Sequence, residues 1–513
     1  MSRTTRATIG AVFGYVRFGT AIVVGLWLVP FTLRHVGAAR YGLWLASGEL
    51  LAYAALADLG VLATVPWLIA EADGKGDRAR MRAVLTAGGS AAILSAAVCA
   101  LISFVLWLLL PSVVRMGPGE RDAVLGPLLV LALIGVVAHP LRVFQSVLEG
   151  VQDVRFTGAL SLFSVAMNAL ITVVLLKRGL GLYALALANA VPAVLIGLWN
   201  LVRVGSIAPD LLRHWERPGW AAIRSMFVQG MGTSAAGWGW RLISASDGLV
   251  LASLGNRTAV AALACTNKLA QALVQLSWVP CDSGLVGLAH LAGEQRGPRL
   301  HDAIVVMVRV YMALAGSVAC IVIAMNPAFV TRWVGPELFA GGLANILIAI
   351  LVVTMTFGHA LAVVPSVLGQ RLQIGTATLA CGLIHVALAF GLGFRLGVVG
   401  VLIAGVISHG IVFAALAWRP FTRATGMHET ALFTDVLWPW GLRMIPLVAI
   451  AFALEQFAGV PRLPYTIGMG GAIAVLGMWY MRPLYLAFGP VRALYDRLLY
   501  WLPLRLAPRA DAT

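Results

Sequence analysis

Residues 33–82 read LRHVGAARYGLWLASGELLAYAALADLGVLATVPWLIAEADGKGDRARMR, and this stretch holds the pattern that decides the fold. A turn at Gly37 is followed by an apolar run, 41–70, which carries two carboxylates, Glu49 and Asp58. The run ends in a loop rich in lysine and arginine. An apolar run of this length, with a basic loop at its end, is typical of a helix that spans a membrane.

The same order of features returns in the second half of the chain. Gly255 follows Gly37 by 218 residues and opens another apolar run, which carries Lys268. Two further segments match in the same order, His139-Pro-Leu-Arg-Val-Phe-Gln-Ser-Val-Leu with His359-Ala-Leu-Ala-Val-Val-Pro-Ser-Val-Leu at an offset of 220, and Gly179-Leu-Gly with Arg395-Leu-Gly at 216. We infer a duplication. Because six helices form an even number, both copies have the same orientation, which predicts parallel repeats with a substrate site between them.

Composition excludes a soluble globular protein. The chain is 60% hydrophobic and 11% charged, its mean hydropathy is +0.90, and charged residues make up about 25% of soluble domains. Runs of about 18 or more apolar residues predict an all-α integral membrane protein with about fourteen transmembrane helices, at 8–30, 41–70, 83–110, 123–147, 156–176, 180–203, 221–252, 258–291, 303–325, 340–364, 372–393, 397–418, 435–457 and 464–486.

The spans predict a two-lobed organisation. The expected parts are an N-lobe of six helices at 1–203, an interfacial linker helix at 204–220, a C-lobe of six helices at 221–418, two extra helices at 419–486 and an amphipathic cytoplasmic tail at 487–513. The linker and the tail place leucine and tryptophan beside arginine, a composition typical of helices that lie in the membrane interface.

In a soluble protein, the net charge of +16 would suggest binding to nucleic acid. Here the basic residues lie in loops, where they indicate on which side of the membrane each loop lies. With the N-terminus in the cytoplasm, the cytoplasmic side receives about 21 Lys and Arg and the outer side about 10, as the positive-inside rule requires. The five cysteines lie in or beside apolar spans at no metal-ligand spacing, and we expect no metal and no cofactor. A phosphate-binding loop and a nucleophile elbow are absent from the sequence, so we expect no ATPase and no enzyme.

Charged side chains inside spans cost about 2.5–3.5 kcal/mol on insertion scales and call for a role. We predict a water-filled substrate cavity lined by Arg17, Arg241, Lys268, Glu49 and Asp247; the alternative is that they form ion pairs that lock the bundle. A cationic cavity suits a phosphate-bearing cargo, because guanidinium groups bind phosphate in a bidentate manner. Asp58, Glu49, His139 and His359 are candidates for coupling to H⁺ or Na⁺, and hydrogen-bonded packing is the alternative for the histidines.

Several short motifs together resemble a known group. Val29-Pro30, Val36-Gly37, Tyr41-Gly42-Leu43 and Asp58-Leu59-Gly60 before a basic loop resemble the opening of Wzx-type polysaccharide flippases. These belong to the MOP superfamily, together with MATE exporters and MurJ-type lipid II flippases. Asp247-Gly-Leu-Val-Leu, Leu254-Gly255 and Asn267-Lys268-Leu269 resemble the seventh and eighth helices of the same group. Arg17 is the only arginine inside a span of the first two helices, which weakens the resemblance to lipid II flippases.

The resemblance implies a two-lobed bundle with a cationic cavity that works by alternating access. The implied cargo is undecaprenyl-diphosphate-linked oligosaccharide for lipopolysaccharide or exopolysaccharide, moved to the periplasmic leaflet of the bacterial inner membrane. Implied partners are membrane lipids and a polysaccharide polymerase or other assembly proteins. The alternatives are a MATE-like exporter of small molecules, a membrane glycosyltransferase or ligase, and a scaffold that transports nothing.

Overall fold

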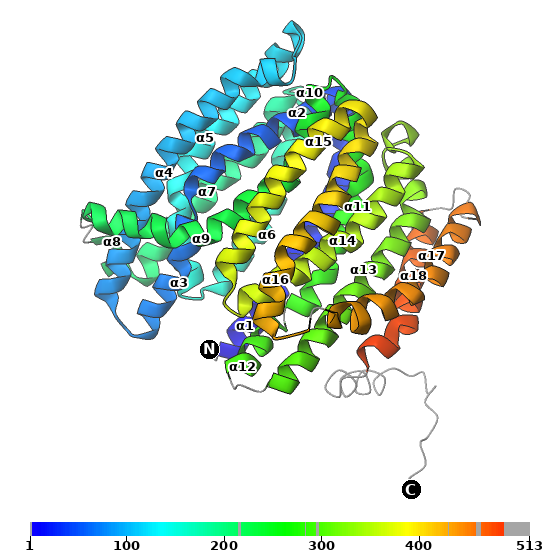
Figure 1. The fold of residues 1–513 in the computed structure, drawn as a ribbon. Coiled ribbons are helices and arrows are strands. Elements are labelled where there is room, and N and C mark those ends of the chain that lie inside the picture. Colours follow the sequence, from blue (N-terminus) through cyan, green and yellow to red (C-terminus); the bar gives the residue numbers. More distant parts are fainter. Residues whose placement is uncertain are drawn as a thin grey trace. The chain divides into compact units, whose positions relative to one another are not determined.

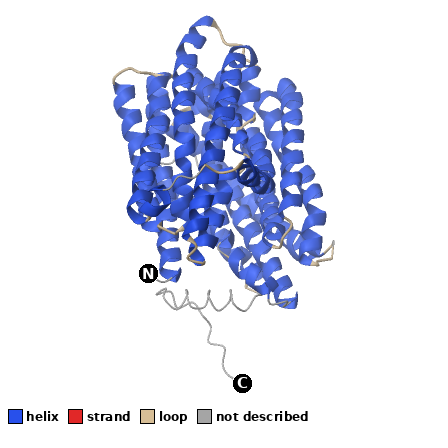
Figure 2. Cartoon of the chain, turned by 90° about the vertical axis from the view of Figure 1, so that its left-hand side faces the viewer, coloured by secondary structure: helices blue, strands red, loops and turns tan. Residues whose placement is uncertain are grey.

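The computed structural model describes residues 3–213, 217–282, 284–293, 297–428, 430–457 and 463–486. In these residues every regular element is a helix (Figure 2). The chain forms two compact units. The first comprises 1–265, 330–340 and 375–408, and the second comprises 266–329, 341–374 and 409–513. The two units are described separately below.

The first unit contains the N-terminal helices and most of one long helix from later in the chain. Its elements are α1 (Arg3–Val36), α2 (Ala38–Ala52), η1 (Tyr53–Asp58), α3 (Val61–Gly74), α4 (Arg78–Val113), α5 (Pro118–Gly150), α6 (Val154–Lys177), α7 (Leu182–Ile207), α8 (Pro209–Arg213), α9 (Trp220–Ser244), α10 (Asp247–Ser253), the start of α11 (Arg257–Asp282), η2 (Pro336–Leu338) and most of α15 (Arg371–Ile407). In it α5 packs along α7, and α1 packs along α6 (Figure 1).

The second unit contains the remainder of the chain. Its elements are the rest of α11, α12 (Leu285–Gly293), most of α13 (Gly297–Trp333), α14 (Gly342–Val367), η3 (Ser408–Phe413), α16 (Ala414–Thr425), η4 (Phe433–Leu437), α17 (Trp438–Phe457) and α18 (Leu463–Tyr485). Within it α16 packs on α14 and α17 on α18. The predicted lobe boundaries stay a prediction, as does the role of the tail at 487–513, which lies outside the described residues.

Ten helices of the described chain are long and apolar enough to cross a membrane, or eleven if one bent pair is a single span, so the count of fourteen is not confirmed. Part of the difference has a physical origin. The stretch Arg371–Thr425 is helical over 55 residues and is one of these ten. A straight helix of that length would be about 82 Å long at 1.5 Å per residue. The hydrocarbon core is about 30 Å thick. This stretch therefore holds both predicted spans, 372–393 and 397–418, joined by a turn at Gly397.

Two predicted spans are broken. The run 41–70 is divided into α2, η1 and α3, with a bend of 44°, because Leu59 and Gly60 take left-handed conformations at φ 49° and 72°. The run 221–252 ends as α9 at Ser244 and resumes as α10 at Asp247. Within the described part of the predicted linker at 204–220, α7 continues to Ile207 and Pro209–Arg213 forms the short helix α8.

The turns support the duplication in backbone terms. Gly37 and Gly255, matched in the sequence, both have φ 85°. Gly181 has φ 54° and ψ −129°, and its counterpart Gly397 has φ 58° and ψ −131°. Residues other than glycine rarely adopt such angles, so the two halves of the chain use the same turn at matched places.

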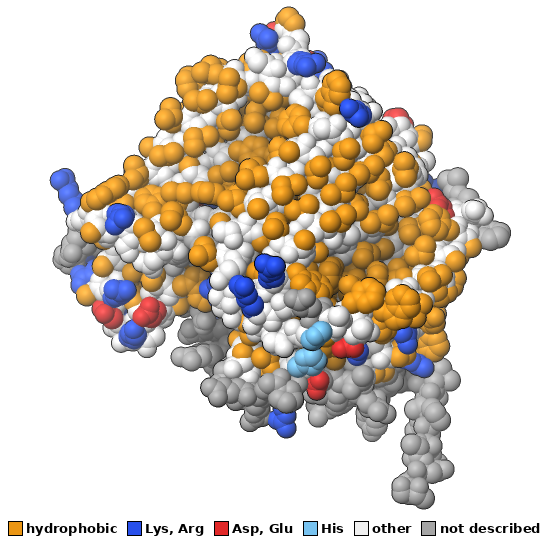
Figure 3. Space-filling view, viewed as in Figure 1, with side chains coloured by type: hydrophobic (Ala, Val, Ile, Leu, Met, Phe, Trp, Pro, Cys, Tyr) orange, Lys and Arg blue, Asp and Glu red, His pale blue; other side chains and the backbone are white. Residues whose placement is uncertain are grey.

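Helix packing in the first unit depends on small residues that let backbones approach closely, as in membrane bundles generally. A Cβ atom on Gly150 of α5 would lie 2.7 Å from Ile69 of α3, and one on Gly88 of α4 would lie 2.8 Å from Val65. Ile69 and Val65 are fully buried in the core between α3, α4 and α5. On the face shown in Figure 3, hydrophobic side chains cover most of the helical surface and Lys and Arg lie mainly near helix ends, as expected for helices in lipid.

Candidate functional site

The break after η1 positions Asp58. Because Gly230 has no side chain, α9 passes against the break; a Cβ there would lie 2.1 Å from the carbonyl oxygen of Leu59. Trp238 lies about two turns further along α9, and its indole donates a hydrogen bond to the carbonyl oxygen of Leu56 at 3.0 Å. This contact uses a backbone acceptor that an uninterrupted α-helix would pair internally. The break is therefore a packed feature of the first unit.

Asp58 and His139, two of the predicted coupling residues, lie together. The Nε2 atom of His139 on α5 is 3.5 Å from Oδ1 of Asp58 and 2.9 Å from the hydroxyl of Ser95 on α4. His139 is 8% exposed. Oδ1 of Asp58 lies at ion-pair distance, but it accepts no hydrogen bond from a described residue. Two of the predicted coupling residues thus lie at ion-pair distance in the first unit.

A second aspartate–histidine pair lies in the second unit. Asp282, the last residue of α11, has Oδ1 at 2.9 Å from Nε2 of His359 on α14 and accepts a hydrogen bond of 2.5 Å from the hydroxyl of Tyr311 on α13. Trp278 stacks on the His359 ring at 3.9 Å between centroids and an angle of 3°. Its indole donates to Thr356. The ring of His359 is thus held in place on its face and at Nε2.

The histidines of the two pairs occupy matched places in the duplication. His139 and His359 are matched in the sequence at an offset of 220, and Asp58 and Asp282 are 224 apart. Asp58 is the last residue of η1 and Asp282 is the last residue of α11, and in each unit the histidine comes from a later helix of the same unit. The offset between the two aspartates is larger than that of the other matched segments by four residues or more.

A third aspartate–histidine pair lies in the first unit and includes the predicted cavity residue Asp247; a second predicted cavity residue, Glu49, contacts the same short helix. Asp247 begins α10, and its Oδ1 is 3.0 Å from Nε2 of His385 on α15. Nδ1 of the same ring is 3.2 Å from the hydroxyl of Ser408. Glu49 of α2 accepts the N–H of Leu249 at 2.8 Å. Two carboxylates thus meet at the N-terminal end of one short helix, where backbone N–H groups favour negative charge.

The three predicted cations belong to other helices. Arg17 of α1 borders a cavity of about 220 Å³ whose wall includes none of the other four predicted cavity residues. Arg241 is exposed on α9, and Lys268 is partly buried on α11, in the second unit. The structure therefore brings Glu49 and Asp247 together, and a common cavity with the three cations stays a prediction.

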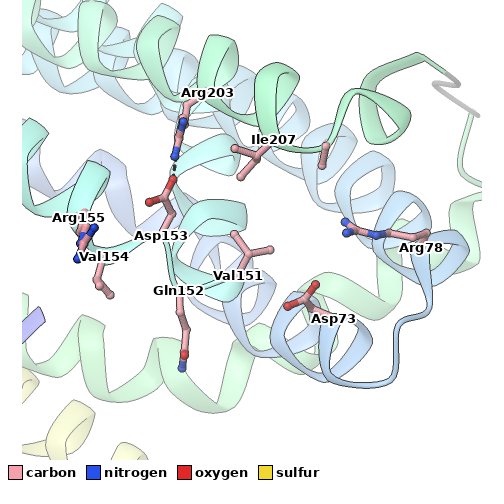
Figure 4. Close-up of a pocket in the computed structure, with 10 residues that line it drawn as sticks. Asp73, Arg78, Val151, Gln152, Asp153, Val154, Arg155, Arg203 and Ile207 are labelled. Carbon is pink, nitrogen blue, oxygen red and sulfur yellow. Dashed lines mark hydrogen bonds and ion pairs between the residues drawn. The ribbon is translucent and has the colours of Figure 1, made fainter. Parts of the chain in front are cut away.

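A larger cavity of about 370 Å³ lies in the first unit where α3, α4, α5, α6 and α7 end or begin (Figure 4). Its wall carries charges of both signs. Nε of Arg203 forms an ion pair with Asp153 at 2.8 Å, and its guanidinium lies over the ring of Phe156. The turn between α5 and α6 contains Gln152 at φ 58°. Because Arg203 is already paired, we assign this group to holding the ends of the helices together.

The sequence did not mark Arg309 as a candidate site residue. Arg309 of α13 donates from Nε to the carbonyl oxygen of Asp435 in η4, at 2.8 Å, and from a terminal nitrogen to that of Leu484 in α18, at 3.3 Å. No sequence signal marks these acceptors, because they are backbone atoms. Among the described residues, no three of His, Cys, Asp and Glu are grouped as metal ligands.

The architecture is that of known transporters. The chain matches a structure described as "Lipid II flippase MurJ, inward closed conformation" with a TM-score of 0.64 and 12% identity, over 94% of this chain and 100% of that one. It matches an inward-facing multidrug resistance MATE family transporter of the MOP superfamily at 0.56 and 15%, over 83% and 99%, and an outward-facing one at 0.53 and 16%, over 82% and 94%. No protein-family model matches the sequence, and no curated protein does. The chain has the fold shared by MATE transporters and the MurJ flippase.

Proposed function

We propose that the chain is a Wzx-like flippase that moves undecaprenyl-diphosphate-linked oligosaccharide from the cytoplasmic to the periplasmic leaflet of the bacterial inner membrane by alternating access. The observation that carries the proposal is the extent of the structural match. The MurJ flippase matches 94% of the chain and the inward-facing MATE transporter 83%. The difference, 11% of 513 residues, is about 56 residues, which is enough for two further spans. The length of the bundle therefore favours a lipid flippase over a drug exporter.

The polar clusters support ion coupling, and the histidines favour H⁺ over Na⁺. Asp58 with His139 and Asp282 with His359 form one pair in each unit, and imidazole exchanges protons near neutral pH. In the proposed cycle, protons bind these pairs from the acidic side and leave on the other, and cargo moves in the opposite direction. A pH difference of one unit is worth about 1.4 kcal/mol per proton, which corresponds to a tenfold ratio of cargo between leaflets for each proton exchanged.

The test is flipping in proteoliposomes. A fluorescent undecaprenyl-diphosphate oligosaccharide is reconstituted with the protein, and the share of label that a membrane-impermeant quencher reaches is followed with and without a pH gradient. We expect flipping by the wild type and a loss of the gradient effect in Asp58→Asn and Asp282→Asn. The matched control is Asp122→Asn, an exposed aspartate on α5, which should behave as wild type.

The outcomes separate the rival functions. A wild type that never moves the lipid under any gradient, but takes up a cationic dye in exchange for protons, would establish the MATE-like exporter instead. Flipping that is unchanged in both aspartate variants would keep the flippase and remove the two pairs from coupling. A sodium gradient that replaces the pH gradient without loss would assign the coupling to Na⁺.

A further inference from the structure

The cavity beside Arg17 has a chemistry of its own. It measures about 220 Å³ and lies in the first unit among α1, α5, α6 and α7. Although these helices are largely apolar, six polar side chains line it: Arg17, Gln145, Thr157, Ser161, Ser164 and Asn200. A cavity that only fills space between membrane helices is lined by apolar groups, since an unsatisfied polar group in lipid costs several kcal/mol. This wall is therefore suited to a polar occupant.

The side-chain oxygen of Asn200 is a buried acceptor in the wall of this cavity. The residue is 1% exposed, it lines the cavity, and its Oδ1 has no hydrogen-bond partner among the described residues. Leaving a buried acceptor unpaired costs about 1–3 kcal/mol. An occupant that donates a hydrogen bond would remove that cost. The missing partner is thus a donor.

The other polar groups also present acceptors. The hydroxyl of Thr157 donates to the carbonyl oxygen of Asp153 at 3.1 Å, and that of Ser161 donates to the carbonyl oxygen of Gly158 at 2.7 Å. Each hydroxyl has only one proton, so both face the cavity with lone pairs. Gln145 donates from Nε2 to Glu149 at 2.9 Å, which leaves its own carbonyl oxygen as an acceptor. The wall is therefore suited to a ligand with several hydroxyl donors.

Arg17 adds one positive charge. Among the described residues no carboxylate lies within ion-pair distance of its guanidinium. A guanidinium has five N–H donors and no acceptor, and it binds carboxylate or phosphate oxygens best. The cavity as a whole thus combines hydroxyl-accepting walls with a single site for an anionic oxygen.

We propose that this cavity is a sugar-selecting subsite, which binds one polyhydroxylated sugar of the cargo through its hydroxyl groups while Arg17 takes an anionic oxygen attached to that sugar. The volume supports one sugar and not a chain, because pockets that enclose drug-sized ligands measure about 300–1,000 Å³. The anionic oxygen is that of a sugar phosphate or of a uronic acid carboxylate. The inference rests on the proposed function, and it names Asn200 and Arg17 as residues that determine which glycan is accepted.

Binding is tested on the purified protein in lipid nanodiscs, without transport. Saturation-transfer NMR measures the dissociation constants of glucose, galactose, their 1-phosphates, glucuronic acid and inorganic phosphate. We expect an anionic sugar to bind at least tenfold more tightly than the neutral one, and tighter binding of the 1-phosphate or of glucuronic acid identifies the source of the charge. Arg17→Gln should abolish this preference while neutral sugars still bind.

Asn200→Ala should weaken all the sugars about tenfold, equal to one hydrogen bond of about 1.4 kcal/mol. Asn189→Ala is the matched control on the same helix, since Asn189 is exposed and does not line the cavity. The inference is overturned if no sugar binds, if inorganic phosphate binds as well as any sugar phosphate, or if both cavity variants bind like wild type. Flipping is measured in parallel: a wild type that flips but binds no sugar refutes only the subsite, and one that binds sugars but never flips refutes the proposed function.

Discussion

The closest helix contact near the first turn gives a sharp stability prediction. Gly42 of α2 faces the start of α11 within the first unit, and a Cβ atom there would lie 2.0 Å from the carbonyl oxygen of Arg257 and 3.3 Å from the amide nitrogen of Ala261. Real Cβ contacts are essentially never below 3.0 Å, so Gly42→Ala requires the two backbones to separate by about 1 Å. Neither partner atom belongs to a flexible side chain.

The size of the effect follows from two opposing terms. Overpacking costs about 1–3 kcal/mol, and the upper end applies because both clashing atoms belong to backbone. Replacing glycine by alanine inside a helix contributes about 1 kcal/mol in the other direction. The net destabilisation is about 2 kcal/mol. Gly48→Ala on the same helix meets nothing within 4 Å, so it should keep only the favourable term. The two substitutions should therefore differ by about 3 kcal/mol.

Thermal unfolding of the purified protein in detergent, followed by loss of the monodisperse size-exclusion peak, measures the difference. We expect the midpoint of Gly42→Ala to fall several degrees below that of wild type, and the midpoint of Gly48→Ala to equal or exceed it. If Gly42→Ala unfolds at the wild-type temperature or above, α2 and α11 do not approach as described. A large drop in the unfolding temperature of Gly48→Ala would contradict the open space beside Gly48.

Three further substitutions test other contacts by the same unfolding assay. Tyr311→Phe removes the donor to Asp282 and should cost about 0.6 kcal/mol and at most about 1.7 kcal/mol, as for other hydrogen bonds between membrane helices; an unchanged midpoint would contradict the contact. Glu49→Ala leaves the N–H of Leu249 unpaired and should cost about 0.5–2 kcal/mol of stability, as for a lost helix cap. Glu49→Gln keeps an acceptor and should unfold like wild type. If both variants lose the same stability, Glu49 does not act as a cap. Arg309→Gln leaves at least one of two carbonyl oxygens unpaired and should cost about 1–3 kcal/mol, while Arg371→Gln, an exposed control, should cost nothing measurable.

The helical architecture could be predicted from the sequence because long apolar runs have few alternatives in lipid. The turns at Gly37 and Gly255 were also predictable, since glycine marks positions where φ is positive. The break at Leu59 was not. A leucine at φ 49° is held there by contacts of α9 that come from 170 residues or more further along the chain, and local sequence carries no record of them.

The same limit applies to the polar clusters. Asp58 and His139 were each recognised as unusual inside a span, but their pairing depends on the bend between η1 and α3, which sets the direction of Asp58. Asp282 was not assigned a role from the sequence. The prediction that Arg17 shares a cavity with Glu49 and Asp247 stays a prediction. Depth along a helix is readable from residue number, whereas the face that a side chain takes depends on neighbouring helices.

Arg309 also bears on which parts of the chain can be removed. The two helices beyond the duplication, α17 and α18, belong to the second unit, and Arg309 bonds to the backbone of Asp435 in η4, just before α17, and to that of Leu484 at the end of α18. A chain shortened after residue 418 would remove both carbonyl acceptors of the Arg309 guanidinium. We therefore expect such a shortened chain to be more stable with Arg309→Leu than with the arginine kept.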